Sequence, residues 1–499
     1  MAAISGFLSM IFGLSFTNIL LLCVLLVSVV FFFSKKNNLP PGPWTLIPYI
    51  GYAPNIAYAL YKGEPLYMFL MQLGNKYGQV FSFTALGMPI VVLNEYKAIR
   101  EAFQDTKLND RGENEMQARV FSRSYNKLDD MAPYRIFALA CFRQFGIGTS
   151  RFEEPISKES TYLIEELSNL QGQSVDLSWH FNNSVSNIIC KVVFGTRFEL
   201  SDERIHRLTN LLNRQGELSG AGGLEMFIPI NIPSKAKQEM NKNVDELHEF
   251  INGMIESHRK NFDHNNLNDV IDLWLNEIRL HKSDEPSSFR NPDNMTGQIL
   301  ALFQAGTDTT SNTLRWGSQY LVRYPKVQDR IHHEIDTVVG RNRLPKLADK
   351  PKLPYTQAFI TELHRIVSLA PLSVFHVAAA KTTFRSYTIP KNSVVISNLY
   401  AVMHSPELWG EPEEFRPERF LDDDGNFHEP SEVIPFGIGH RVCLGEALAR
   451  QELFIFFTHL LHQFKFEKTS ENTPMPTLKP IDGMALRPEP YKLRVTKRD

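Results

Sequence analysis

The sequence predicts one large, mainly α-helical domain with small peripheral β-sheets, placed behind an N-terminal membrane helix. Three observations support this fold class. Helical patterns of apolar residues dominate from Glu153 onward, the β-strand patterns are short, and no Pro/Gly/Ser-rich linker divides the chain after Pro43. A length of 499 residues would by itself favour two or three domains. Without an internal linker or a sequence repeat, we expect a single body instead.

Composition excludes several classes of protein. The chain has 53 basic and 55 acidic residues and a net charge of -2, whereas nucleic-acid binders normally carry a strong basic excess, so we expect no nucleic-acid partner. The four cysteines, Cys23, Cys141, Cys190 and Cys443, are too few and too scattered for a disulfide framework. They are typical of thiols that stay reduced in a cytosolic setting.

The N-terminal segment is predicted to be a membrane anchor. Residues 1–34 contain no Asp, Glu, Lys or Arg, and Phe16–Phe33 is almost wholly apolar. Roughly 20 apolar residues suffice to span a bilayer as a helix. A cleaved signal peptide is the alternative, but the apolar run is longer than a typical signal core and no small-x-small cleavage site follows it. Lys35 and Lys36 follow instead, which places the rest of the chain in the cytosol.

A short hinge follows the anchor. Leu39–Pro43 reads LPPGP, and its prolines cannot continue a helix but favour a stiff, extended linker. We therefore expect a transmembrane anchor at residues 1–34, a basic, proline-rich hinge at residues 35–44 and a catalytic body at residues 45–499.

Within the body, the elements follow from residue periodicity. Gly78–Val92 alternates around a Leu-Gly-Met break, which predicts a hairpin, and a helix is expected at Glu95–Phe103. Lys282–Asn294 is polar and rich in turn residues, so a surface loop is expected there. Further helices are predicted at Ile156–Leu170, Trp179–Phe194, Val244–Phe262, Gln298–Arg323 and Lys326–Val339, and strands at Thr383–Ile389, Val394–Ile396 and Tyr491–Val495.

One cysteine differs from the other three. Cys23, Cys141 and Cys190 lie in apolar segments and are typical of small buried residues. Cys443 precedes Leu444–Phe457, whose apolar residues recur at helical spacing. Its sulfur is therefore expected at a helix N-terminus, where the helix dipole and free amides would lower the pKa of the thiol.

The residues before Cys443 favour a flat, negatively charged ligand. Gly437 and Gly439 allow a tight bend and a close approach of the backbone, and Arg441 carries a permanent positive charge suited to a carboxylate. This combination suits a haem, with the sulfur on iron and the arginine on a propionate. A nucleophilic-cysteine enzyme is the competing hypothesis, but no histidine is placed by the sequence as its base, and His440 lies too close along the loop to judge.

The stretch FGIGHRVCLG, residues 436–445, resembles the Phe-x-x-Gly-x-Arg-x-Cys-x-Gly signature of the cytochrome P-450 superfamily at every fixed position. The segments LPPGPW, DTTSNTL and LPYTQAFI are similar to those of animal microsomal members of its second family. The resemblance runs from the anchor to the last strand and implies the cytochrome P-450 fold. It also implies haem b (iron protoporphyrin IX), contacted by Phe436, Gly439 and Arg441, with the Cys443 thiolate as the axial ligand of the iron.

Two more segments resemble that superfamily. Glu362-Leu-His-Arg365 matches its Glu-x-x-Arg helix, and Pro417-Glu-Arg419-Phe matches its Pro-Glu-Arg-Phe segment. The resemblance implies that Glu362, Arg365 and Arg419 form a buried structural triad on the haem side of the core. Spacing alone would favour an ordinary exposed i,i+3 ion pair between the first two residues.

Gln298–Arg323 is predicted to be a long helix with a defect in its middle. Residues 306–310, Gly-Thr-Asp-Thr-Thr, are all poor helix formers and predict a local opening of the backbone hydrogen-bond ladder. The alternative is that the threonine hydroxyls bond to carbonyls one turn back. The segment resembles the superfamily's oxygen-binding motif, which implies that Thr309 hydrogen-bonds bound dioxygen and that Asp308 helps to deliver protons.

Further basic groups are expected at the haem carboxylates. By the resemblance, His376, Arg111 and Arg135 contact the cofactor, although a plain surface role would suit each of them equally well. The superfamily usually has a tryptophan four residues before the arginine that aligns with Arg135, and this chain has Met131 there. The resemblance places the walls of an apolar substrate pocket at Glu113–Tyr125, Leu302–Thr309, Leu372–Phe375 and Asp482–Met484.

Electrons must come from another protein, because no dinucleotide-binding glycine pattern or flavin-binding unit occurs in the sequence. The resemblance implies NADPH as an indirect donor through NADPH–cytochrome P-450 reductase, with cytochrome b5 as a second donor. Both donors are acidic, and Arg143, Lys158 or Arg450 are the basic residues expected to meet them.

The sequence therefore predicts a haem-thiolate monooxygenase that inserts one atom of dioxygen into a hydrophobic small molecule such as a lipid, steroid or xenobiotic. We expect a single-pass protein of the endoplasmic reticulum membrane with a cytosolic catalytic domain. A haem-thiolate isomerase or dehydratase that needs no external electrons is one alternative, and Asp308 and Thr309 argue against it. A non-catalytic haem-binding protein is the other, and it would lack turnover with every donor.

Overall fold

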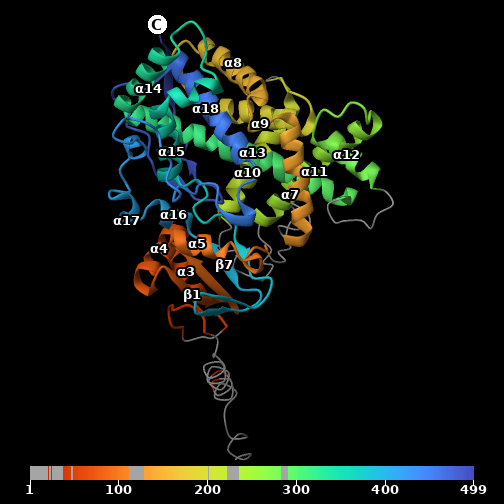
Figure 1. Cartoon of the computed structure of the whole chain (residues 1–499), viewed down its shortest axis with the longest axis vertical. Coiled ribbons are helices and arrows are strands. Elements are labelled where there is room, and N and C mark those ends of the chain that lie inside the picture. Colours follow the sequence, from red (N-terminus) through yellow and green to blue (C-terminus); the bar gives the residue numbers. More distant parts are fainter. Residues whose placement is uncertain are drawn as a thin grey trace, which may run out of the picture.

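The computed structural model describes residues 38–45, 49–111, 128–199, 202–221, 235–281 and 290–498, together with Leu21 and Val24. These residues form a helical body with small sheets, which confirms the mainly α prediction, and the first helices and strands gather at one end of it (Figure 1). The rest of the expected membrane helix and the pocket wall at Glu113–Tyr125 lie outside the described residues. Across the described ranges, no helix is long and apolar enough to cross a membrane.

Helices account for most of the body. At the N-terminal end lie α3 (Ala53–Tyr61), α4 (Leu66–Tyr77) and α5 (Tyr96–Ala102). The large helices are α7 (Leu128–Phe145), α8 (Glu153–Asn169), α9 (Ser178–Phe194), α10 (Glu203–Ala221), α11 (Lys235–Lys260), α12 (Val270–Leu280), α13 (Pro292–Arg323), α14 (Pro325–Val338), α15 (Pro354–Val367) and α18 (Glu446–Gln463). Two short helices, α16 (Leu399–Met403) and α17 (Pro406–Trp409), follow the sheet residues.

The expected helices are all present, but three of them are longer than predicted. α11 begins at Lys235 rather than Val244, because its first turns are rich in Lys, Gln and Asn and show little apolar periodicity. α13 begins at Pro292, inside the segment predicted to be a loop, and proline is well suited to a first helical position. α18 continues to Gln463 and is buried along most of its length, so it has no polar face to mark its end.

The main sheet joins distant parts of the chain and has the order β1-β2-β7-β4. β1 (Val80–Ala85) and β2 (Met88–Leu93) form the predicted antiparallel hairpin. β2 then pairs in parallel with β7 (Val394–Ser397), so the two segments lie side by side in Figure 1. β7 in turn pairs with β4 (His376–Val377). The backbone amide of Val377 donates to the carbonyl of Asp110 at 2.7 Å, which brings His376 close to Arg111.

The remaining strands form three small sheets. The segment predicted to be one strand at Thr383–Ile389 is instead a two-strand hairpin, because Arg385 adopts a left-handed φ of 52° and turns the chain. The strands are β5 (Thr382–Phe384) with β6 (Tyr387–Ile389), β9 (Pro480–Ile481) with β10 (Arg487–Pro488), and β3 (Ser174–Val175) with β11 (Leu493–Lys497) and β8 (Phe464–Glu467).

The long central helix α13 packs against α9, α11 and α18 and is continuous through residues 306–310. The expected opening of its backbone ladder is therefore wrong. A Cβ on Gly306 would lie 2.5 Å from Cδ1 of Ile189, so the glycine allows α9 to pack closely. The Thr309 hydroxyl donates to the carbonyl of Ala305 at 2.8 Å, one turn back, which stabilises the hydroxyl without breaking the helix.

Candidate active site

The loop before α18 is shaped by its glycines. Gly439 has a left-handed φ of 82°, and a Cβ at this position would lie 2.7 Å from the carbonyl oxygen of Phe103. No side chain fits in that space, so the loop requires glycine here. The backbone amide of Cys443 donates to the carbonyl of Phe436 at 2.9 Å and closes the loop. The residues of the signature motif are thus brought together as predicted.

The three cysteines of the described chain divide in the way that the sequence predicts. Cys141 and Cys190 are buried, whereas Cys443 is exposed. Burial also raises the pKa of Cys141 to about 12, so its thiol stays protonated at neutral pH. An accessible thiol that leaves its loop ahead of a helix can bind a metal or react, and a buried protonated thiol cannot.

The electrostatics of Cys443 differ from the expectation. Desolvation by the surrounding chain raises the pKa of its thiol above the ordinary value. The backbone amides of Gly445 and Glu446 and the charge of Arg135 lower this pKa, but they do not overcome the desolvation. The helix that begins at Glu446 therefore supplies amides to the sulfur as predicted, yet the predicted net direction of the shift is wrong.

Two of the predicted arginines are fixed by backbone carbonyls. Arg111 donates through Nη1 to the carbonyl of Phe375 at 3.0 Å, and Arg441 donates through Nε to the carbonyl of Asn109 at 2.9 Å. Backbone carbonyls thus help to orient both guanidinium groups.

His376 lies beside these arginines. Its ring stacks on Phe103 at 3.9 Å between ring centroids, and Nδ1 lies 3.0 Å from the carbonyl oxygen of Leu108. Burial, together with the charges of Arg111 and Arg441, lowers the pKa of His376 well below its ordinary value. The imidazole is therefore neutral, and its single N–H is on Nδ1, where it donates to the Leu108 carbonyl. Nε2 is then an acceptor and would have to take up a proton before it could donate to a carboxylate.

The inner face of α13 carries the predicted catalytic residues. Ala305 and Thr309, one turn apart, are exposed on a helix whose neighbouring positions Phe303, Thr307 and Thr310 are buried. Such exposed positions in the middle of the longest helix mark open space inside the body. Ala305 and Thr309, four residues apart, thus share one face of α13.

The carboxyl of Asp308 is partly buried, and burial raises its pKa to about 7, while the charge of Arg487 opposes the rise. At neutral pH this carboxyl therefore exists in both the protonated and the ionised form. A group with a pKa near the working pH can both accept and release a proton.

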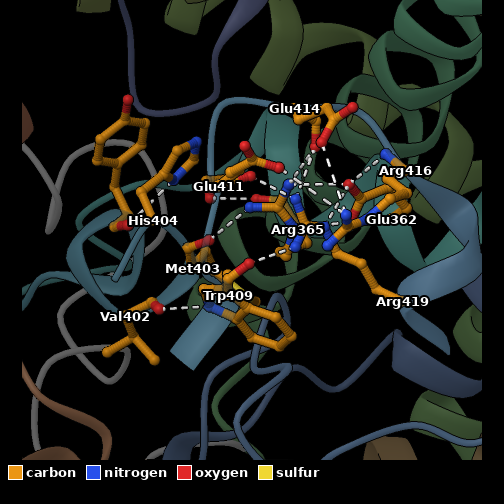
Figure 2. A network of polar contacts seen from close by, with 12 residues as sticks. Glu362, Arg365, Val402, Met403, His404, Trp409, Glu411, Glu414, Arg416 and Arg419 are labelled. Carbon is orange, nitrogen blue, oxygen red and sulfur yellow. Dashed lines mark hydrogen bonds and ion pairs between the residues drawn. The ribbon is translucent and has the colours of Figure 1, made fainter. Parts of the chain in front are cut away.

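The predicted triad is buried and paired. Arg365 and Glu362 have side chains that are 0% exposed, and they form two hydrogen bonds, Nε to Oε2 at 2.6 Å and Nη2 to Oε1 at 2.9 Å. Figure 2 shows Glu362 between Arg365 and Arg419, whose Nε lies 3.4 Å from Oε1. The three residues therefore meet as the resemblance implies, and the exposed-pair interpretation is wrong.

Backbone groups complete this network. Arg365 donates to the carbonyls of Met403 at 2.8 Å and Glu414 at 3.2 Å, and the amide of Arg416 donates to Glu362 at 2.8 Å (Figure 2). Arg419 also donates to the carbonyls of Trp409, Glu411 and Glu414. The triad thus fixes the segment that leads from α16 to the cysteine loop.

Other predicted positions are less informative. Arg135 lies on α7, close enough for its charge to act on Cys443, but the side chain of Met131 lies outside the described residues. Of the expected pocket walls, Leu302 and Leu372 are partly buried and Met484 is 53% exposed.

Sequence reasoning missed two charged residues near α13. Glu452 on α18 is 1% exposed and hydrogen-bonds Thr310, and burial raises the pKa of its carboxyl to about 8. Its place directly before the apolar run LFIFF, residues 453–457, was the available signal. Arg487 on β10 acts on Asp308 from a segment far along the chain, and no local pattern indicates this contact.

The residues present fit a haem. Gly439 lets the loop approach the Phe103 carbonyl closely, and Cys443 presents the one exposed thiol among the described cysteines. Arg111 and Arg441 offer donors and positive charge suited to two carboxylates, and His376 lies beside them.

Comparisons with known proteins agree with this geometry. The model of the cytochrome P450 family matches residues 40–495. The chain is 33% identical to cytochrome P450 2G1 of Rattus norvegicus over 488 residues, which cover 96% of this chain and 97% of that protein. It is 35% identical to cytochrome P450 18a1 of Drosophila melanogaster, over 97% of this chain and 91% of that protein. It is 34% identical to cytochrome P450 2J2 of Homo sapiens, over 92% of this chain and 91% of that protein. The chain therefore belongs to the cytochrome P450 family and is a haem-thiolate monooxygenase.

Proposed function

We propose that this monooxygenase binds haem b through the Cys443 thiolate and inserts one oxygen atom into a hydrophobic small molecule. The observation that carries the assignment is the exposed Cys443 at the end of a loop in which Gly439 leaves no room for a side chain. Phe436 and Gly439 shape that loop, and Arg441 leaves it toward Asn109. The three basic residues Arg111, Arg441 and His376 would hold the haem carboxylates, with Arg135 on the cysteine side.

Bound haem supplies iron for the activation of dioxygen, and its cysteine thiolate ligand favours O–O cleavage. The chain has to exclude bulk water from the reacting oxygen and to deliver protons to one end of it. Thr309, exposed on the inner face of α13, offers a hydroxyl that can accept a hydrogen bond and donate one in turn. Asp308, one residue earlier, can exchange protons at neutral pH and would supply them to this hydroxyl.

The structural triad would hold the backbone below the haem. Glu362, Arg365 and Arg419 fix the carbonyls of the segment between α16 and the cysteine loop, and the side chains of Glu362 and Arg365 are fully buried. A rigid support of this kind keeps the cysteine loop at a constant distance from α13.

We propose electron supply from NADPH through the membrane-bound cytochrome P-450 reductase, with cytochrome b5 as a second donor. Arg143 and Lys158 are exposed and available to an acidic partner. Arg450 is less suitable than expected, because it pairs with Glu429 at 2.9 Å and with Glu446 at 2.9 Å.

The proposed organisation keeps an anchor at residues 1–34, a hinge at residues 35–44 and a catalytic body at residues 45–499. The apolar run and the two lysines after it support placement in the endoplasmic reticulum membrane with the body in the cytosol.

The function is tested by reconstituting the full chain with haem and reductase in lipid. The reduced carbon monoxide spectrum should show thiolate ligation, and Cys443→Ser should abolish it, while Cys141→Ser serves as the matched control. NADPH-dependent oxygen uptake followed by mass-spectrometric screening of lipid, steroid and xenobiotic pools should then identify the oxygenated product. An unchanged spectrum in Cys443→Ser would refute the ligand assignment, and product formation without oxygen uptake would identify an isomerase or dehydratase.

A further inference from the structure

Two charged side chains from different elements approach the same glycine. A Cβ built on Gly216 of α10 would lie 3.5 Å from Nη1 of Arg487 and 3.9 Å from Oδ2 of Asp308. Arg487 comes from β10 and Asp308 from α13. Since glycine has no side chain, α10 leaves room for the guanidinium and the carboxyl to share this space.

Arg487 is held by one side-chain hydrogen bond and by the strand from which it projects. Its Nη1 donates to the carbonyl of Asn213 on α10 at 3.4 Å, and its Nη2 is buried without a hydrogen-bond partner among the described residues. β10 itself is tied to α13, because Arg315 donates to the carbonyl of Pro488 at 3.3 Å. The guanidinium therefore keeps its place even though no partner uses its second nitrogen.

Among the residues that the structure describes, Arg487 is the charged group that acts on Asp308. α10 presents Gly216 and Asn213 here, and neither titrates. α13 presents Arg315 two turns further on, and that residue acts on Arg487 itself. Burial raises the pKa of Asp308 to about 7, and the charge of Arg487 lowers it, so the two effects oppose each other at one carboxyl.

We propose that Arg487 is a positioning residue that keeps the Asp308 carboxyl able to ionise at neutral pH, and that Gly216 provides the space for this pair. The inference rests on the proposed function, in which Asp308 delivers protons beside Thr309. A carboxyl that stayed protonated at every working pH could release no proton, so the nearby positive charge is what makes the exchange reversible.

The test is the titration of Asp308 in the full, haem-loaded chain. Infrared difference spectra across pH report the carboxyl band, and Asp308→Asn identifies which band belongs to this residue. Removing the charge with Arg487→Gln should raise the pKa of Asp308 by about one unit, as expected for loss of a charge at this range. Arg487→Lys should preserve the parental value, because it retains the positive charge.

Gly216 offers a second route to the same measurement. Gly216→Leu should separate the pair and raise the pKa of Asp308 without removing either charge. Gly216→Ala is the matched control, because its Cβ would make only ordinary contacts at 3.5 and 3.9 Å. An unchanged Asp308 titration in Arg487→Gln would overturn the inference, and if that variant does not fold, an unchanged titration in Gly216→Leu would overturn it as well.

The outcome is separable from the proposed function. The ratio of peroxide released to NADPH consumed should shift along the pH axis in Arg487→Gln together with the Asp308 titration. If the titration shifts but this ratio does not, the Arg487 assignment stands and the proton-delivery role of Asp308 is removed from the proposed function.

Discussion

Arg365→Ala is the most informative perturbation of the buried triad. The substitution removes two charge-assisted hydrogen bonds to Glu362, at 2.6 and 2.9 Å, from a position that is 0% exposed. It also leaves the carbonyl of Met403 without its guanidinium donor. Glu362 retains two partners, Nε of Arg419 at 3.4 Å and the amide of Arg416 at 2.8 Å. Its carboxylate therefore loses its strongest ion pair but is not left without a partner.

Breaking a buried ion pair by removing one partner costs about 3–5 kcal/mol. A domain is typically stable by only about 5–15 kcal/mol, so this loss is a large fraction of the total. The segment that the triad fixes leads into the cysteine loop, and we therefore expect Arg365→Ala protein that binds no haem. Arg365→Lys keeps the charge but cannot form the two-point contact, and an intermediate loss is expected.

The assay combines haem content, from the reduced carbon monoxide spectrum, with urea unfolding followed by tryptophan fluorescence. Trp409 is a suitable reporter, because Arg365 lies 5.6 Å from its ring centroid. Arg207→Ala is the matched control, since Arg207 makes a similar two-point contact with Glu246 at 2.5 and 2.6 Å but is 61% exposed. Normal haem content and an unshifted unfolding midpoint in Arg365→Ala would refute the triad assignment.

Three further predictions concern chemistry, pH and the redox partner. Thr309→Ala should raise the peroxide released per NADPH consumed. Thr313→Ala should not, although it removes a hydroxyl with an equivalent helix hydrogen bond one turn further along α13. The folded state holds the proton on Glu452 up to a pKa of about 8, so stability should fall as the pH rises from about 4.5 to 8. Glu452→Gln should remove this dependence, so that by pH 8 its free energy of unfolding in urea has gained about 4 kcal/mol relative to that of the parent. If the free energy of unfolding changes equally with pH in both proteins, the prediction is contradicted. Arg143→Glu combined with Lys158→Glu should weaken reductase-supported turnover, but not turnover driven by an added organic hydroperoxide; equal loss in both assays would argue against a docking role.

Much of the fold could be predicted because its signals are local. α9, α14 and the β1–β2 hairpin lie close to their expected bounds, since each has a periodic apolar face and a clear break. The predicted defect in α13 was wrong because helix propensity treats Gly306 as a weakness. In the folded chain the same glycine admits Ile189 of α9, so tertiary packing outweighs the local cost.

The site shows the same division between local and distant causes. The glycines and Cys443 lie in one loop, and their shared geometry could be expected from ten residues of sequence. The burial of Arg365 could not, because it depends on Met403 and Glu414, which reach it only through the fold. The pKa of Cys443 could not be predicted either, since the desolvation that raises it comes from the surrounding elements.

Two acids, Asp308 on α13 and Glu452 on the neighbouring α18, show how the fold sets the protonation of a carboxyl. The result depends on how far a nearby positive charge offsets the effect of burial on the pKa. Glu452 has the Thr310 hydroxyl as its neighbour, and no cation in the described part of the chain lowers its pKa. Burial therefore prevails, and the carboxyl stays protonated up to about pH 8. Asp308 has the through-space charge of Arg487, which counteracts burial and leaves its pKa at about 7. Of these two, Asp308 alone adjoins the exposed face of Thr309. The acid that can exchange protons at neutral pH is therefore the one beside the open space, and the acid that cannot is the one sealed behind the helix.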